Sequence, residues 1–177
     1  PEMKHDGQMG LMASNGIPSR VVRHWVKQEE SLCTHSVLPD EDSTFRDMAL
    51  MEVTRGCIWA CRFCTAGFIY RPPRLPNLEK TFNSMEAKLA GIGKTSGTVG
   101  LVGPSVTDHP ELPALARKIT EKGKTLSFSS LRMETLTDEL VDLILLSGQK
   151  TLTVAVDGPS ERMRDVINKA ATDDFII

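Results

Sequence analysis

Residues 48–64 read MALMEVTRGCIWACRFC, a short apolar run that leads directly into three cysteines. The run at 48–53 predicts a buried β-strand. Cys57, Cys61 and Cys64 then form a C-x3-C-x2-C pattern on the short loop that follows the strand. Three thiolates on one loop can converge on one inorganic centre, because soft sulfur ligands favour zinc, cuprous copper or iron–sulfur clusters.

Three interpretations of this cysteine trio remain open on spacing alone. A cubane iron–sulfur cluster can be held by three cysteines, with one iron left open to a substrate. A zinc site takes a fourth protein ligand, so the alternative of a non-catalytic zinc-binding interaction module needs one more donor. The available donors are Cys33, His5, His24, His35 and His109. In the third interpretation the trio is reduced, buried and free of metal.

Strands and helices alternate along the rest of the chain. Apolar runs predict further strands at 97–102, 125–129 and 151–156, and helices at 78–92, 111–122, 137–147 and from Pro159 to about 169. Asp108 and Thr137 are expected N-caps, and Gly123 and Gly148 are expected to end helices. Alternation of this kind is typical of parallel strands joined by right-handed crossovers. Four such units predict an α/β fold, either part of a barrel or part of an open doubly wound sheet.

Composition and charge exclude several classes of protein. The 21 basic and 23 acidic residues give 21 − 23 = −2, which argues against holding nucleic acid by bulk phosphate neutralisation. Hydrophobic residues make up 40% and charged residues 25%, a globular composition. No apolar run approaches the roughly 20 residues that span a bilayer. We therefore expect a soluble, cytoplasmic protein that neither crosses a membrane nor binds nucleic acid.

The cysteine motif, with Phe63 directly before its last cysteine, resembles the signature of radical S-adenosylmethionine (radical SAM) enzymes. Residues 34–177 as a whole are similar to one uncharacterised branch of that superfamily, which is often fused to a cobalamin-binding domain. The segments that carry this similarity are 52–74, 99–103, 107–110, 129–132 and 160–169.

The resemblance implies a fold and a domain organisation. It implies a partial TIM-like (β/α) barrel with six parallel strands, of which this sequence carries about four βα units. Residues 1–45 are then a linker or lead-in segment, and residues 46–177 are a radical SAM core that lacks its C-terminal end. We accordingly expect a fragment of a larger protein.

The resemblance also implies cofactors and a reaction. The three cysteines would bind a 4Fe–4S cluster, and S-adenosylmethionine would be cleaved to a 5′-deoxyadenosyl radical that abstracts hydrogen from an unknown substrate. An electron donor such as flavodoxin or ferredoxin would be the partner. Cobalamin would enter only through an upstream domain outside these 177 residues.

Five further residues match positions that bind S-adenosylmethionine in the family. Phe63 would lie against the adenine, or would be a simple core aromatic. Gly103 follows the second strand, in the turn that holds the amino group, although the acidic residue common there is missing. Arg132 suits the carboxylate, because a guanidinium binds it in bidentate fashion. Asp157, where relatives carry glutamate, and Ser160 lie near a helix N-terminus that can meet an anion. For these polar residues, caps and turns are the alternative.

Overall fold

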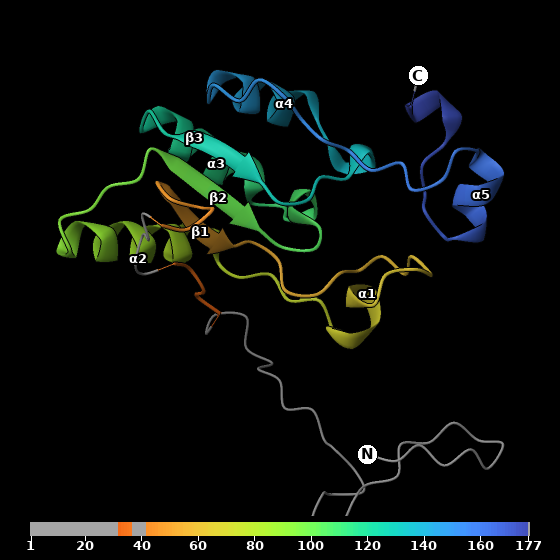
Figure 1. The fold of residues 1–177 in the computed structure, drawn as a ribbon, viewed down its shortest axis with the longest axis horizontal. Coiled ribbons are helices and arrows are strands. Elements are labelled where there is room, and N and C mark those ends of the chain that lie inside the picture. Colours follow the sequence, from red (N-terminus) through yellow and green to blue (C-terminus); the bar gives the residue numbers. More distant parts are fainter. Residues whose placement is uncertain (1–31, 37–41, 177) are drawn as a thin grey trace, which may run out of the picture.

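A three-stranded parallel sheet forms the centre of the computed structural model, which describes residues 32–36 and 42–176. The strands are β1 (Met48–Glu52), β2 (Thr98–Val102) and β3 (Thr125–Phe128), in the order β1-β2-β3 (Figure 1). Met51 pairs with Leu101, and Leu101 pairs with Phe128. The first three predicted strands are thereby confirmed, as is their parallel arrangement.

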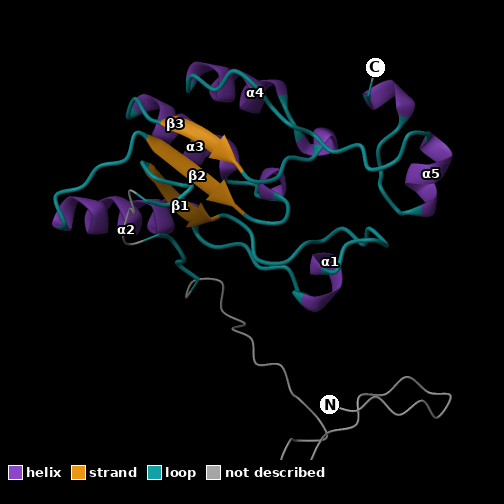
Figure 2. Cartoon of the chain, in the orientation of Figure 1, coloured by secondary structure: helices purple, strands orange, loops and turns teal. Residues whose placement is uncertain are grey.

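A helix follows each strand, as Figure 2 shows. These helices are α2 (Leu78–Gly91), α3 (Leu112–Glu121) and α4 (Asp138–Leu146). Two short helices, α1 (Ala66–Ile69) and α5 (Glu161–Val166), and the 3₁₀ turns η2 (Val106–Asp108), η3 (Met133–Thr135) and η4 (Asp173–Phe175) complete the described chain. The structure therefore has the partial βα-barrel architecture that the resemblance implies.

The core lies between one face of the sheet and the three longer helices. In β1 alternate residues are buried, because successive side chains of a strand point to opposite faces. The central strand β2 buries three consecutive residues, Val99 to Leu101. Met51, Leu101 and Leu126 contribute from the strands, and Phe82 and Ile119 from α2 and α3. This packing fixes the direction of the strands and therefore the edge of the sheet at which their carboxyl ends meet.

Local capping signals correctly predict the start of α4 and the ends of α3 and α4. The Thr137 side chain accepts a hydrogen bond from Leu140 N at 3.3 Å at the start of α4. Gly123 and Gly148 have φ values of 70° and 87° beyond α3 and α4, a conformation that glycine adopts readily. The prediction for Asp108 is wrong, since Glu111 occupies the N-cap position of α3.

The predicted fourth strand at 151–156 is not observed. These residues, all of them described, form neither strand nor helix, and most of them are exposed. A β-branched sequence forms a strand where its side chains pack on a half-buried surface, and in this segment Leu152 is the residue that packs against the core. Within residues 32–36 and 42–176, three βα units followed by α5 are present, rather than about four.

The outer edge of β1 is covered by the N-terminal described segment. Ser36 N donates to Leu50 O at 2.7 Å, and Glu52 N donates to Thr34 O at 2.8 Å, in an antiparallel bridge. The sequence also allows a short helix at 21–30, a stretch that lies outside the described residues. None of the described helices combines the length and apolarity that crossing a membrane requires.

Candidate functional site

The three cysteines lie on one loop that leaves the carboxyl end of β1. We call residues 53–65 the cysteine loop. Cys57 and Cys61 are buried and Cys64 is half-buried, with Cys64 N donating to Cys61 O at 3.1 Å. Gly56 has a φ of 83°, and an added Cβ there would overlap the Tyr70 carbonyl. In βα barrels the active site lies at this carboxyl edge.

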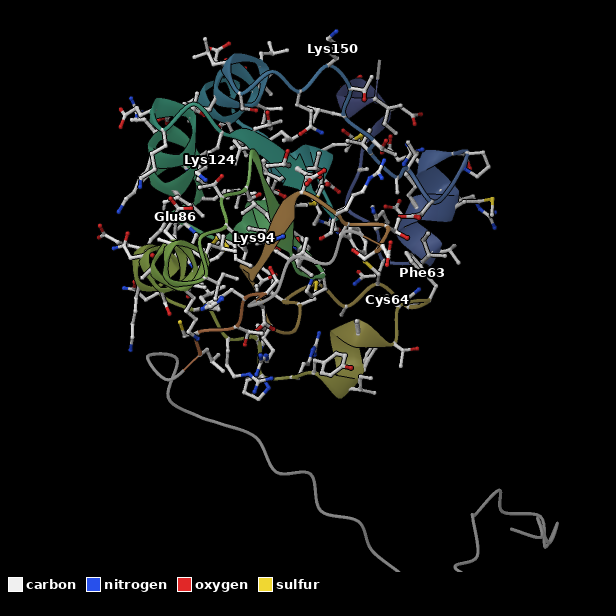
Figure 3. All side chains as sticks on the ribbon, turned by 60° about the vertical axis from the view of Figure 1, so that its left-hand side comes forward. Phe63, Cys64, Glu86, Lys94, Lys124 and Lys150 are labelled. Atoms are coloured by element: carbon white, nitrogen blue, oxygen red, sulfur yellow. The ribbon has the colours of Figure 1, made fainter. Side chains whose placement is uncertain are left out.

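The last residue of α5 and the two residues after it hold one part of the cysteine loop. Arg62 N donates to Ile167 O at 2.8 Å, and its guanidinium bonds Val166 O. Asn168 Nδ2 donates to Ala60 O at 2.9 Å. Figure 3 accordingly shows the labelled Phe63 and Cys64 beside the α5 ribbon. Three hydrogen bonds therefore join the cysteine loop to a segment about 100 residues away.

A buried polar network holds another part of the loop. The Arg132 guanidinium lies 3.9 Å from the centre of the Trp59 ring, and its Nη1 is 3.9 Å from Cys61 Sγ. Its Nη2 forms an ion pair with Glu134 at 2.8 Å. Trp59 Nε1 donates to Asp108 Oδ2 at 2.6 Å. Arg132 is thus surrounded by an aromatic face, a carboxylate and a cysteine sulfur.

Several polar atoms of this network are buried without a hydrogen-bond partner among the described residues. They are Asp108 Oδ1, Arg132 Nε, Glu134 Oε2 and the nearby Ser105 Oγ. Buried polar atoms in folded proteins nearly always have a partner. The network therefore has spare hydrogen-bonding capacity beside the cysteine loop.

The pKa of the Cys57 thiol is raised above its usual range, mainly by burial. A backbone hydrogen bond at Trp59 and the charge of Arg132 act in the opposite direction, while the Asp108 carboxylate and Cys61 raise the pKa further. Without a bound cation the neutral thiol is favoured. Metal binding at Cys57 would consequently release a proton.

A cavity of about 460 Å³ opens beside the cysteine loop. It is lined by residues from the carboxyl ends of all three strands and from α1, among them Glu52, Gly56, Gly103 and Ser129. Gly103 N and Ser129 Oγ lie 3.2 Å apart, which ties the loops after β2 and β3 together. The volume falls in the range of about 300–1,000 Å³ that small-molecule sites occupy.

Of the five residues predicted to bind S-adenosylmethionine, three lie on or beside the cysteine loop or its cavity, and two have partners in and after α5. Gly103 lines the cavity and Arg132 contacts the cysteine loop, while Phe63 lies on that loop with 55% of its surface exposed. Asp157 instead forms an ion pair with Lys169 at 2.6 Å, and Ser160 caps α5 by accepting from Met163 N. Contact with S-adenosylmethionine stays a prediction for all five.

Sequence reasoning did not connect Trp59, Asp108 and Glu134 with the cysteines. The tryptophan inside the C-x3-C spacing was the one local signal for such a network. The neighbouring residues Asp108 and His109 would suit an acid–base pair by sequence, but His109 is buried and both its ring nitrogens have backbone partners, Pro76 O and Glu111 N. The Asp108 carboxylate is directed instead to Trp59.

The arrangement of the donor side chains can be compared with the needs of a single metal ion and of an iron–sulfur cluster. Within residues 32–36 and 42–176, no three His, Cys, Asp or Glu side chains are grouped closely enough to hold a single metal ion. The donor set consists of three thiols on one loop, of which Cys57 and Cys61 are buried. The cavity beside this loop is lined by its residues Thr54, Arg55 and Gly56. Such thiol donors fit an iron–sulfur cluster, which distributes its sulfur ligands over several iron atoms.

Comparison with known proteins establishes the family. Residues 51–177 match the model of the radical SAM superfamily. The chain is also 37% identical, over 131 residues, to an uncharacterized protein of Methanocaldococcus jannaschii. That alignment covers 73% of this chain and 28% of the archaeal protein, so the chain spans just over a quarter of the relative's length. The chain belongs to the radical SAM superfamily, whose members generally bind a 4Fe–4S cluster and S-adenosylmethionine.

Proposed function

We propose that Cys57, Cys61 and Cys64 bind a 4Fe–4S cluster with which this chain cleaves S-adenosylmethionine reductively. The observation that carries the proposal is the cysteine loop itself: three thiols at the carboxyl edge of a parallel sheet, beside a cavity of about 460 Å³. Membership of the radical SAM superfamily supports the same chemistry. The bound cluster would supply one electron to the sulfonium, which yields methionine and a 5′-deoxyadenosyl radical that takes hydrogen from the substrate.

The protein's own contribution is to hold and shield the reacting groups. The cysteine loop is fixed by Arg132 and Trp59 in one place and by residues 166–168 in another. The cavity at the strand ends would receive S-adenosylmethionine, with Gly103 at its wall. Phe63 is available to lie against an adenine, since over half of its surface is exposed.

The remaining parts of the proposal come from the family. Flavodoxin or ferredoxin would deliver the electron, and a cobalamin domain would act only from upstream of these residues. Asp157 and Ser160 would complete the S-adenosylmethionine site only by exchanging their present partners, Lys169 and Met163 N.

Anaerobic reconstitution with iron and sulfide, followed by reduction in the presence of S-adenosylmethionine, tests the proposal. The expected result is a brown protein that releases 5′-deoxyadenosine. The matched control is Cys33→Ala, which removes a thiol outside the cysteine loop and leaves both properties unchanged. A colourless protein that holds one zinc ion through the three loop cysteines would contradict the proposal and support a zinc-binding module.

A further inference from the structure

Arg132 occupies an unusual position for a charged side chain. It is 6% exposed, and its guanidinium is stacked on Trp59 at 3.9 Å. A stacked guanidinium is held in one plane, which directs its N–H groups. The Nη1 group is directed at Cys61 Sγ, 3.9 Å away. Among the described cationic side chains, Arg132 is the one for which a hydrogen bond to a cysteine sulfur is observed.

The charge of Arg132 is balanced by one carboxylate, but the hydrogen-bonding groups of the pair are only partly used. Glu134 forms an ion pair with its Nη2 at 2.8 Å, and the Glu134 side chain is itself 10% exposed. Arg132 Nε has no partner among the described residues, and neither has Glu134 Oε2. The Arg132–Glu134 ion pair thus lies next to the cysteine loop and is largely buried. Electrostatic interactions are stronger in the protein interior than in water.

We infer that Arg132 is a positioning residue that orients the cysteine loop through Trp59 and raises the reduction potential of the centre held by Cys61. The inference rests on the proposed function for the nature of that centre. Reduction adds negative charge, so a nearby cation and a hydrogen bond to a ligand sulfur stabilise the reduced state. Glu134 acts in the opposite direction, because its carboxylate offsets the guanidinium.

This assignment gives Arg132 a role different from the carboxylate contact that the sequence suggests. Its Nη1 and Nη2 groups are directed to Cys61 and Glu134, and Trp59 covers the guanidinium plane. Trp59 is fixed in turn by Asp108, which accepts its indole N–H at 2.6 Å. Arg132 therefore acts through the loop and the cysteine sulfur.

Opposite shifts in midpoint potential provide the decisive test. In reconstituted protein, Arg132→Ala is expected to make the midpoint potential more negative, and Glu134→Gln is expected to make it less negative. The midpoint potential of Arg132→Lys is expected to lie between those of Arg132→Ala and the wild type. Arg117→Ala is the matched control, because Arg117 is an exposed arginine paired with Glu139 on the protein surface. If Arg132 had a purely structural role, Arg132→Ala would change the fraction of protein that holds a cluster but not the midpoint potential of the clusters that remain. That result would overturn the inference.

The orientation of the loop is tested in iron-free protein. The chain has two tryptophans, Trp25 and Trp59, so Trp25→Phe leaves Trp59 as the reporter. In that background Arg132→Ala is expected to raise the acrylamide quenching constant of Trp59 about twofold, since the guanidinium no longer covers the ring. Arg117→Ala should leave quenching unchanged, and the same result for Arg132→Ala would contradict the positioning role.

The two measurements separate this inference from the proposed function. Wild-type protein that assembles no cluster would refute the proposed function and the tuning of a potential, while the quenching result would still decide the positioning role. Wild-type protein that assembles a cluster whose potential does not respond to Arg132→Ala or Glu134→Gln would refute the inference alone.

Discussion

Gly103 follows β2 and lies against Thr54, at the start of the cysteine loop. A Cβ added to Gly103 would overlap Thr54 Oγ1 and lie 2.9 Å from the Thr54 carbonyl oxygen. The position therefore requires glycine because two loops approach each other closely, whether or not a ligand is bound. This approach brings the loop after β2 next to the cysteine loop and shapes the cavity between them.

Gly103→Ala is expected to destabilise the protein by about 1–3 kcal/mol, the usual cost of overpacking. The free energy of unfolding from urea denaturation measures the effect. Gly91→Ala is the control, since nothing lies within 4 Å of an added Cβ at the end of α2, and there alanine favours the helix by roughly 0.5–1 kcal/mol. Equal stability of Gly103→Ala and the wild type would contradict the close approach.

At the level of single residues, the sequence identifies those features of the site that depend on short spacing. The three cysteines fall on one loop, so their spacing alone reveals them. The hydrogen bond between Trp59 and Asp108 joins residues 49 positions apart, and that between Asn168 and Ala60 joins residues 108 apart. Contacts of this kind depend on how the chain packs, and no local pattern predicts them.

Among the elements, α5 and the residues that follow it are organised around one buried arginine. Arg164 is 1% exposed, and its Nε donates to Ala171 O at 2.6 Å and its Nη1 to Gly158 O at 3.0 Å. It also forms an ion pair with Asp173. These bonds shape the segment that docks on the cysteine loop through Ile167 and Asn168.

Arg164→Ala is expected to destabilise the protein by about 2–4 kcal/mol, because two carbonyls lose a donor and each buried unsatisfied group costs about 1–3 kcal/mol. Thermal or urea unfolding provides the measurement. Arg162→Ala is the control on the exposed side of the same helix, with an expected change within about 0.5 kcal/mol. A similar effect for both variants would contradict the role of Arg164.

The predictability of an element depends on whether its signal is local. Thr137 and Gly148 are recognised as helix ends because capping involves neighbouring residues alone. The strand predicted at 151–156 has the composition of a strand, but most of its side chains are exposed and Leu152 is the one that packs against the core. Asp108 resembles a cap in sequence, yet its carboxylate is directed to Trp59.

On the scale of the whole molecule, β2 is the central strand, with β1 and β3 on its two sides. The backbone hydrogen bonds of a central strand break only when much of the structure unfolds, so that its amides exchange with solvent slowly. Hydrogen exchange is therefore expected to be slowest for the amides of β2, such as Val99 and Leu101. Residues 151–156 are expected to exchange fast, since they form no strand. Comparable protection of these residues and β2 would contradict the observed three-stranded sheet.

The parallel sheet and its helical crossovers follow from the alternation of strand and helix signals, and membership of the radical SAM superfamily agrees with them. The absence of a fourth strand and the docking of residues 166–168 on the cysteine loop depend on packing between distant segments. The sequence thus predicts the order and parallel arrangement of the strands, while the residues that surround the cysteines are identified only from the structure.

The central claim is that three cysteines together hold one iron–sulfur cluster. Iron and sulfide content after anaerobic reconstitution tests it most directly, with Cys57→Ala, Cys61→Ala and Cys64→Ala each compared with Cys33→Ala. We expect each of the three loop variants to lose most of its iron and sulfide, while Cys33→Ala retains the wild-type content. Wild-type iron and sulfide content in any one of the three loop variants would contradict it.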